Sequence, residues 1–508
     1  MLFCGLRVRI VCAILFIVIY LVWRKNLEKE IGILCHVSSL PSKYGVGDFG
    51  EEAYKFVDFL AKNNVKIWQI LPLNQTGETN CPYYSDCSFS YDEMFFDVDD
   101  LVKRKLIKKD DASRLENLPK GENVDYSLVK KEKKAIFEKA YQNASKEILQ
   151  DLDKYLDENK DVFGYAVYRS MLEKNNIFDW RLLEKDLLDC ETKKYAQFEK
   201  DNKQLILKYG FFQYILDMQW KALKKYANDR GVMILGDLPI YPNVMSYDVY
   251  MNKSAYQLDK KFNMLCTGGV PKSSPDEIEQ NWGSCVYDWK YLEKNNYEYL
   301  IKKIKMLLEK FDVLRLDHLY GYVEHYEYST KNSAENKWVR AGGMDFFSKL
   351  GKHVDMNKVV VENLGFIKEE CDKLMKKFNL TGMCLLQDVL ACDRYLPKKV
   401  EQNNIFYLGT HDSNTFIGFY DSLDETKKEK FCKLLEIENG DSKDVLISAL
   451  KQVYKSPAKY VIFQVQDLLL QDGFSRMNIP GIAYGQWEYK MPKNYSCQVA
   501  KTLKQIRE

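Results

Sequence analysis

The sequence predicts a (β/α)8 TIM barrel with a large helical insertion, and three observations support this. Short Val-, Ile- and Leu-rich runs, typical of parallel strands buried on both faces, alternate with segments that have apolar residues at helical spacing. Three of these runs end at acidic residues, Asp317, Glu362 and Asp412, which lie about 45 to 50 residues apart as βαβ units require. The segment from about 100 to 205 interrupts the alternation with a stretch rich in Lys, Glu and Leu. Because active sites of such barrels lie where strands end, the three carboxylates are a candidate catalytic set.

The first βαβ unit can be placed from the start of the globular chain. A strand is expected over 31–37, followed by a loop that contains Ser38-Ser39-Leu40-Pro41. A helix is expected over 51–62, where apolar residues recur at helical spacing: Ala53, Phe56, Val57 and Leu60. A second strand is expected over 65–72, and the insertion follows it.

The alternation resumes after the insertion with a long helix that ends near Arg230-Gly231. The third strand is expected over 232–237. Five further helix and strand pairs are expected to end at Asp317, at Glu362, near Leu385-Leu386-Gln387, at Asp412 and near Ile479-Pro480-Gly481. These eight strand candidates predict one barrel over 27–508, with the helical insertion at about 100–205.

Composition limits the classes of function. A chain of 508 residues with 46% hydrophobic content can bury a large core. The formal net charge of +2, from 75 basic and 73 acidic residues, provides no field that would attract a polyanion, so nucleic acid is not an expected partner. The thirteen cysteines are an odd number and include no C-x-x-C pair, which favours neither a disulfide framework nor a zinc site. A reducing cytoplasm is the simplest setting.

The N-terminal residues 1–26 form an apolar extension that is read separately from the barrel. Residues 10–23 are uninterrupted apolar residues with basic flanks, but about 20 residues are needed to span a membrane. A signal peptide is disfavoured because no small-x-small cleavage site follows. Two interpretations stay open: a signal anchor, or a misassigned start in which Trp23-Arg24-Lys25 encodes a bacterial ribosome-binding site and Leu27 is the true first residue. The second is favoured for a bacterial source, and membrane association is expected only if residues 10–23 are retained.

Short loop motifs occur in a fixed order along the chain, and together they are far more specific than any one of them. They are Ser38-Ser39-Leu40-Pro41, Trp68-Gln69-Ile70-Leu71-Pro72-Leu73, Cys81-Pro82-Tyr83-Tyr84-Ser85, Gly236-Asp237-Leu238-Pro239-Ile240, Gly269-Val270-Pro271, Arg315-Leu316-Asp317-His318, Glu362-Asn363-Leu364-Gly365, Gly409-Thr410-His411-Asp412 and Arg476-Met477-Asn478-Ile479-Pro480-Gly481. In these motifs the chain resembles the amylomaltase, or 4-α-glucanotransferase, family of the α-amylase clan. The resemblance extends from about Ile31 to about Tyr489.

The resemblance implies a role for each central carboxylate. Asp317 matches the nucleophile, Glu362 the acid/base, and Asp412 the carboxylate that holds the hydroxyls of the distorted donor sugar. Retention by two displacements requires an ionised carboxylate that attacks the anomeric carbon and a protonated one that donates to the leaving oxygen, ~5–5.5 Å apart. We expect Arg315 to keep Asp317 ionised and a more apolar, carboxylate-crowded setting to keep Glu362 protonated.

Other residues match substrate-binding positions of the family. They are Tyr83, Asp237, Gln280, Trp282, Arg315, His318 and His411. The two histidines are expected to donate hydrogen bonds to sugar hydroxyls, and Tyr83 to stack on a donor sugar. Asp237 is either a substrate contact or a structural turn residue. Gln280 and Trp282 lie in a segment that resembles the family's mobile loop over the acceptor side.

Three departures from the family pattern affect how the site is tuned. Ser284-Cys285 stands where Asn-Pro is usual, Cys81 replaces a usual Ser, and Asn363 replaces a usual Asp. The lost charge at Asn363 could lower the pKa of Glu362 or alter a hydrogen bond beside it. All three central carboxylates are present, so we expect activity.

The resemblance implies a 4-α-glucanotransferase of maltodextrin, starch or glycogen metabolism in the cytoplasm. Its expected partners are α-1,4-glucans and maltooligosaccharides, with glucose as an acceptor. No metal or other cofactor is expected, because paired carboxylates need none and no metal or phosphate motif is present. Two alternatives remain at this stage: an α-glucan hydrolase with the same carboxylates, in which water takes the intermediate, and an inactive membrane-tethered glycan-binding protein.

Overall fold

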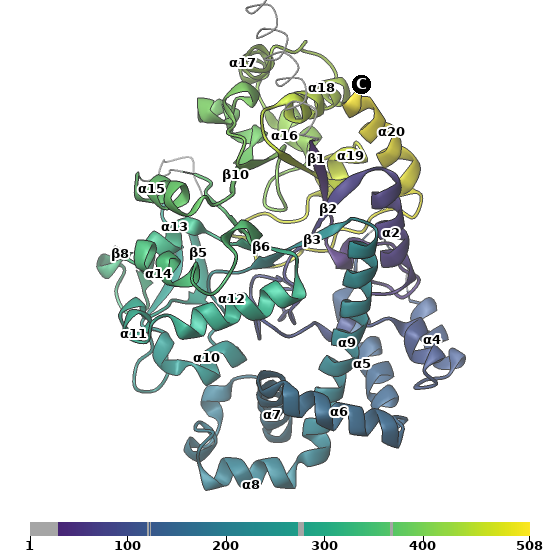
Figure 1. Cartoon of the computed structure of the whole chain (residues 1–508), viewed down its shortest axis with the longest axis vertical. Helices are drawn as coiled ribbons and strands as arrows, with labels where there is room; N and C mark the ends of the chain where they lie inside the picture. The colour runs from purple at the N-terminus through teal and green to yellow at the C-terminus, as the bar shows by residue number, and fades with distance from the viewer. Residues whose placement is uncertain (1–28, 119–120, 122, 273–278, 366–368) are drawn as a thin grey trace, which may run out of the picture.

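Eight parallel strands form one sheet that curls into a barrel (Figure 1). The computed structural model describes residues 29–118, 121, 123–272, 279–365 and 369–508. The strand order is β10 (Gly382–Leu385), β11 (Asn404–Tyr407), β12 (Tyr460–Gln464), β1 (Glu30–Leu34), β2 (Val65–Gln69), β3 (Met233–Leu238), β6 (Val313–Leu316) and β9 (Val359–Val361). The two ends of this sheet meet, since Val360 pairs in parallel with Thr381, just before β10. The predicted (β/α)8 barrel is therefore confirmed.

The last strand of the barrel is not the one that the sequence analysis predicted. Residues 479–481 lie in a loop, and the eighth strand is β12, whose sequence is Tyr-Val-Ile-Phe-Gln. β12 is buried along most of its length and pairs with both β1 and β11. A central strand needs all its backbone N–H groups, which Pro480 cannot supply, so the apolar run at 460–464 is the better strand.

Helices surround the barrel, and further helices extend the molecule at one end. Around the strands lie α2 (Glu51–Lys62), α9 (Lys203–Asp229), α12 (Glu298–Lys310), α13 (Leu319–Val323), α14 (Gly343–Leu350), α15 (Glu369–Phe378), α19 (Val465–Leu468) and α20 (Tyr495–Arg507). At one end of the view are α16 (Phe416–Ser422), α17 (Glu425–Leu435) and α18 (Ser442–Lys455) (Figure 1). α10 (Tyr247–Met251) and α11 (Trp289–Lys294) complete the set of helices after β3.

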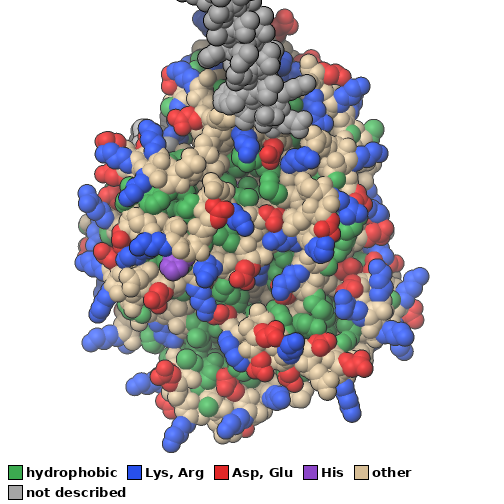
Figure 2. Space-filling view, viewed as in Figure 1, with side chains coloured by type: hydrophobic (Ala, Val, Ile, Leu, Met, Phe, Trp, Pro, Cys, Tyr) green, Lys and Arg blue, Asp and Glu red, His purple; other side chains and the backbone are tan. Residues whose placement is uncertain are grey.

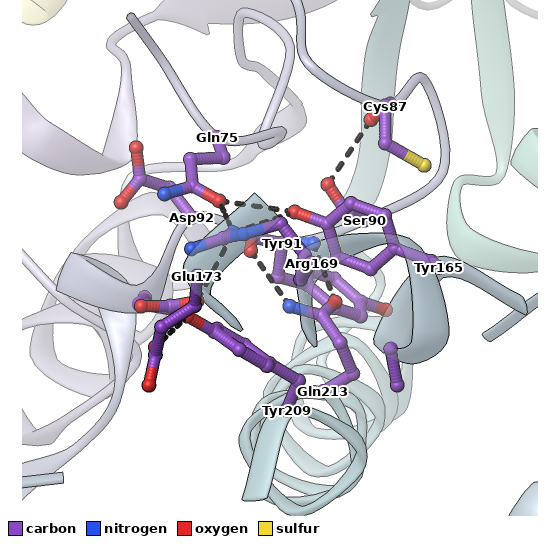
Figure 3. Close-up of polar contacts among 12 residues, drawn as sticks. Gln75, Cys87, Ser90, Tyr91, Asp92, Tyr165, Arg169, Glu173, Tyr209 and Gln213 are labelled. Atoms are coloured by element: carbon purple, nitrogen blue, oxygen red, sulfur yellow. Dashed lines mark hydrogen bonds and ion pairs between the residues drawn. The ribbon is translucent and has the colours of Figure 1, made fainter. Parts of the chain in front are cut away.

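Between β2 and β3 the chain forms mostly helices, and these hold the loop that follows β2. They are α3 (Val98–Lys103), α4 (Lys109–Glu116), α5 (Tyr126–Gln142), α6 (Lys146–Glu158), α7 (Lys160–Asn175) and α8 (Lys193–Asp201), with the start of α9. On α7, the Arg169 guanidinium donates to Gln75 Oε1 and to the Tyr165 hydroxyl (Figure 3). On α5, Lys130 Nζ donates to Asn80 Oδ1 over 2.9 Å. The loop after β2 is thus fixed by polar contacts from two helices.

A second, antiparallel sheet lies beside the barrel, with strand order β5-β4-β7-β8. The strands are β4 (Cys266–Val270), β5 (Gln280–Cys285), β7 (Glu324–Ser329) and β8 (Lys337–Arg340). Gln280 and Trp282 therefore lie on an edge strand, whereas the resemblance suggested a mobile loop. β5 can approach β4 closely because β4 contains Gly269, where a Cβ would lie only 2.0 Å from the Gln280 carbonyl oxygen.

The apolar N-terminal residues 1–26 lie outside the described residues. Among the helices that the structure describes, none is long and apolar enough to span a bilayer. On the face shown in Figure 2, basic and acidic side chains are interspersed, with no extended region of one sign. This agrees with the small formal net charge of +2.

Gly236 in β3 provides a test of how tightly the barrel wall packs next to the site. A Cβ at this position would lie 2.2 Å from the ring of Phe311. We expect Gly236→Ala to lower the free energy of unfolding by about 1–3 kcal/mol, because the ring or the strand must move. Denaturant unfolding measures this change. Gly440→Ala is the control, since nothing lies within 4 Å of a Cβ there, and equal stability of the two variants would contradict the prediction.

Candidate active site

One buried guanidinium contacts three carboxylates at the C-terminal end of the barrel. Arg315 is 2% exposed. Its Nη1 lies 2.6 Å from Asp237 Oδ2 and 3.0 Å from Asp317 Oδ1, and its Nη2 lies 2.8 Å from Glu362 Oε2. Asp237 lies on β3 and Arg315 on β6, whereas Asp317 and Glu362 follow the ends of β6 and β9. These four residues form one ionic cluster, which we call the Arg315 cluster.

Strand register explains why these four side chains meet. β3, β6 and β9 are neighbours, and Asp237 pairs directly with Arg315, which in turn pairs with Val360. Asp317 follows Arg315 by two residues, so the pleat directs both side chains to the same face. Glu362 comes directly after β9, and its backbone N–H donates to Leu316 O over 3.1 Å. The parallel alignment of the three strand ends brings the carboxylates together.

The surroundings of Asp317 and Glu362 shift their two pKa values in opposite directions. Burial raises the pKa of Asp317 well above its ordinary value, and the neighbouring charges of Glu362 and Asp237 add to this although Arg315 opposes it. Burial also acts on Glu362, but the Arg315 charge and the His318 imidazole and backbone N–H outweigh it and lower the pKa of Glu362. Both carboxyl groups contact the same guanidinium, Asp317 through Nη1 and Glu362 through Nη2. The pKa of Asp317 is thus shifted upward and that of Glu362 downward, in a pair that titrates as one unit.

Asp412 lies after β11 and is held by groups from three directions. Asn478 Nδ2 donates to its Oδ1 over 2.6 Å, and Arg476 Nη2 donates to its backbone carbonyl over 2.7 Å. His411 Nε2 lies 3.3 Å from its Oδ2. Burial would raise the pKa of Asp412, but the His411 and Asn478 contacts, with the more distant Arg315, lower it well below its ordinary value. Asp412 is thus a fixed, ionised carboxylate that is 44% exposed at its side chain.

Three aromatic rings form a wall beside Asp412. The rings of Tyr83 and His411 stack with centroids 5.1 Å apart and an interplanar angle of 13°, and Trp487 lies tilted against both. The Tyr83 hydroxyl donates to Asp237 Oδ2 over 2.6 Å, which links this wall to the Arg315 cluster. One face of Tyr83 is therefore covered by His411, and a sugar could contact only the rest of the ring.

His318, Trp282 and Gln280 lie on the other side, next to Glu362. His318 has a left-handed backbone, with φ of 50°, and its N–H donates to Glu362 Oε2 over 2.9 Å. The indole of Trp282 meets the His318 ring edge-on, with centroids 5.0 Å apart. Trp282 Nε1 in turn donates to Gln280 Oε1 over 3.2 Å. All three side chains are partly exposed.

The departure at Asn363 keeps a structural hydrogen bond. Asn363 Oδ1 accepts from the Met383 backbone N–H over 2.6 Å, and an aspartate carboxylate could accept the same bond. Arg394 Nη2 donates to the backbone carbonyls of Asn363 and Gly365, each over 3.2 Å. These contacts fix the loop that carries Glu362. At the second departure, burial raises the pKa of the Cys81 thiol to about 12, so the thiol stays protonated.

The structure brings all the predicted site residues to one end of the barrel, and it adds others that the sequence analysis did not assign. Arg476 and Asn478 belong to the motif at 476–481, which marks the segment but does not predict its contact with Asp412. No sequence pattern indicates a role for Trp487 or Arg394. Within the described residues, no group of three or more His, Cys, Asp or Glu side chains is arranged to hold a metal ion.

Comparison with known proteins identifies relatives over nearly the whole chain. Residues 35–496 match the protein family described as 4-alpha-glucanotransferase. The 4-alpha-glucanotransferase of Aquifex aeolicus is 34% identical over 472 residues, covering 92% of this chain and 96% of that protein. The enzyme of the same name from Clostridium butyricum is 33% identical, covering 90% and 96%. The solved amylomaltase from Streptococcus agalactiae in complex with acarbose superimposes with a TM-score of 0.89 at 27% identity, covering 95% of this chain and 100% of that one.

The Arg315 cluster predicts a pH-dependent loss of stability when its cation is removed. We expect Arg315→Leu to cost about 3–5 kcal/mol of unfolding free energy near neutral pH, because one buried and two largely buried carboxylates lose their partner. Without the cation their folded-state pKa values rise above the unfolded ones, so the folded state binds more protons and stability falls as pH rises. The deficit should therefore be larger at pH 8 than at pH 5. Denaturant unfolding at both pH values measures it, with the exposed Arg114→Leu as control. A pH-independent deficit would contradict the prediction.

Proposed function

The chain belongs to the 4-α-glucanotransferase family, and on that premise we propose that Asp317, Glu362 and Asp412 carry out a retaining transfer of an α-1,4-glucan segment to the 4-hydroxyl of an acceptor sugar. The observation that carries this proposal is that Asp317 and Glu362, at adjacent strand ends, contact one guanidinium over 3.0 and 2.8 Å. A shared cation favours the short separation of ~5–5.5 Å that retaining enzymes need, whereas inverting enzymes need a wider gap for a water molecule.

In the first step the Asp317 carboxylate attacks the anomeric carbon of the donor. The glycosidic bond breaks, and its oxygen leaves with the proton of Glu362, which gives a covalent ester between Asp317 and the donor segment. In the second step the acceptor 4-hydroxyl attacks the anomeric carbon, Glu362 takes the hydroxyl proton, and Asp317 is released. One proton shared by the two carboxyl groups is enough for both steps.

The first step requires an ionised Asp317 and a protonated Glu362. Burial and the neighbouring charges oppose this distribution in the free protein, because they raise the pKa of Asp317 and lower that of Glu362. Arg315 lies 3.0 Å from Asp317 and 2.8 Å from Glu362, so its charge can stabilise either carboxylate. We infer that a donor sugar between the pair favours the protonated Glu362 and the ionised Asp317, and that the activity depends on the pair as a unit with two apparent pKa values.

The two sides of the pair suggest where donor and acceptor bind. Glu362 must reach the leaving oxygen, so the acceptor side is the side of Glu362, with His318, Trp282 and Gln280 around it. The donor segment then lies against Asp412 and the wall of Tyr83, His411 and Trp487. The Asp237 side chain is fully buried between Arg315 and Tyr83 and supports this wall from behind. α-1,4-Glucans and maltooligosaccharides are the proposed donors and glucose or glucans the acceptors, and acarbose in the similar amylomaltase supports this substrate class.

An activated donor tests the two roles together. We expect Glu362→Gln to lose activity on maltotriose by several orders of magnitude but to accept α-maltosyl fluoride, whose leaving group needs no proton. The intermediate should then accumulate on Asp317, and mass spectrometry of peptides locates it. Asp317→Asn is the control, which should form no adduct. An adduct on any residue other than Asp317 would contradict the assignment of the nucleophile. The absence of any adduct on a Glu362→Gln variant that still binds maltooligosaccharide would contradict the assignment of Glu362 as acid/base.

The contacts of Arg394 predict that it positions the acid/base without touching substrate. In Arg394→Met the carbonyls of Asn363 and Gly365 lose their donor, and a displacement of about 1 Å at Glu362 costs roughly a hundredfold in rate. We expect this loss with maltotriose but a much smaller loss with α-maltosyl fluoride. Lys398→Met, an exposed cation paired with Glu436, is the control. Equal losses on both donors would mean that Arg394 only supports the fold.

A further inference from the structure

Five partly exposed aromatic rings form a continuous track that begins at the acceptor side. The track, which we call the aromatic track, runs from Trp282 through His318, Tyr320 and Trp338 to Tyr326. Successive ring centroids are 5.0, 6.3, 5.4 and 5.2 Å apart, so each ring touches the next. The function proposed above uses only the first two rings.

The outer three rings come from elements that pack beside the barrel mouth. Tyr320 lies on α13, two residues after His318, while Tyr326 and Trp338 are a cross-strand pair of β7 and β8. β8 is the edge strand opposite β5 in the small sheet, and three of its four residues are exposed. The track therefore leads from the catalytic residues to the surface.

Burial distinguishes the track from an ordinary core cluster. Each of its five residues is partly exposed, and Trp338 is 41% exposed. By contrast, Phe346 and Phe347, also in a ring cluster beside α13, are fully buried at 0%. Aromatic rings that only fill a core gain most by complete burial, so a line of accessible rings favours a ligand with apolar faces.

The track continues the proposed acceptor site without a break. His318 belongs to both, because its backbone N–H binds Glu362 and its ring contacts Trp282 and Tyr320. We propose that Tyr320, Tyr326 and Trp338 bind the glucose units of an α-1,4-glucan acceptor beyond the first one. This inference rests on the proposed function, since it takes the Glu362 side as the acceptor side. Sugar rings pack their apolar C–H faces on aromatic faces, and a chain of such units can follow a line of rings.

Acceptors of different length test the track. Fluoride release from α-maltosyl fluoride is measured at rising concentrations of glucose, which is too short to reach Trp338, and of maltotetraose. We expect Trp338→Ser to raise the acceptor KM for maltotetraose relative to that for glucose by about fivefold, the size of one lost aromatic contact. Trp338→Phe, which keeps an aromatic face, should restore most of the difference. Phe178→Ser is the control, since Phe178 is 89% exposed on the segment after α7.

Other outcomes overturn the inference. An unchanged KM ratio in Trp338→Ser, or an equal rise for both acceptors, would mean that the outer rings do not bind the acceptor chain. An unchanged ratio together with altered sedimentation would assign the rings to a contact between two copies of the chain. If no acceptor speeds fluoride release in the parent protein, the proposed function fails. Calorimetric binding of maltotetraose to the parent and to Trp338→Ser then decides the track separately, and equal affinities would reject it.

Discussion

The site depends on the burial of one guanidinium among three carboxylates. If Asp237, Asp317 and Glu362 were all ionised, three negative charges would face the single positive charge of Arg315 in a poorly hydrated space. Burial in such a space, with Coulomb repulsion from Glu362 and Asp237, raises the pKa of Asp317. This raised pKa is thus a consequence of packing four groups at three strand ends. A double displacement has to move a proton on these same carboxyl groups, so stability and chemistry depend on the same cluster.

The parts of the site that could be predicted are those encoded locally. An apolar run followed by an acidic residue describes a buried parallel strand and its C-terminal end, and this identified the positions of Asp317, Glu362 and Asp412. The order of the loop motifs then indicated the family. The predicted position of the eighth strand was wrong because the Pro-containing motif near 479–481 was chosen over the apolar run of β12. β12 is not followed by a residue of evident catalytic type, so a motif-based prediction does not identify it.

The parts that could not be predicted depend on pairing between distant segments. β5 is a strand because it pairs with the glycine-containing β4, and nothing within 280–285 indicates that partner. Arg394 reaches the carbonyls of Asn363 and Gly365 only because η9 (Asp393–Tyr395), a short 3-10 helix after β10, folds back over them. The pKa values of the two carboxyl groups also depend on distant segments. Arg315 is close to Asp317 in the chain, but the sequence does not show that the same guanidinium contacts Glu362.

The asymmetry of the site bears on why a sugar rather than water completes the reaction. On the proposed donor side, Asp412 and the wall of Tyr83, His411 and Trp487 are fixed by hydrogen bonds and ring contacts. On the proposed acceptor side, the rings are accessible and lead outward from His318. Water gains nothing from an aromatic face, whereas each sugar unit gains apolar contact and displaces water from the path to the anomeric carbon. An acceptor that covers more of the aromatic track would therefore react more often with the ester intermediate. The length of the acceptor chain, and not the carboxylates, would then set the balance between transfer and hydrolysis.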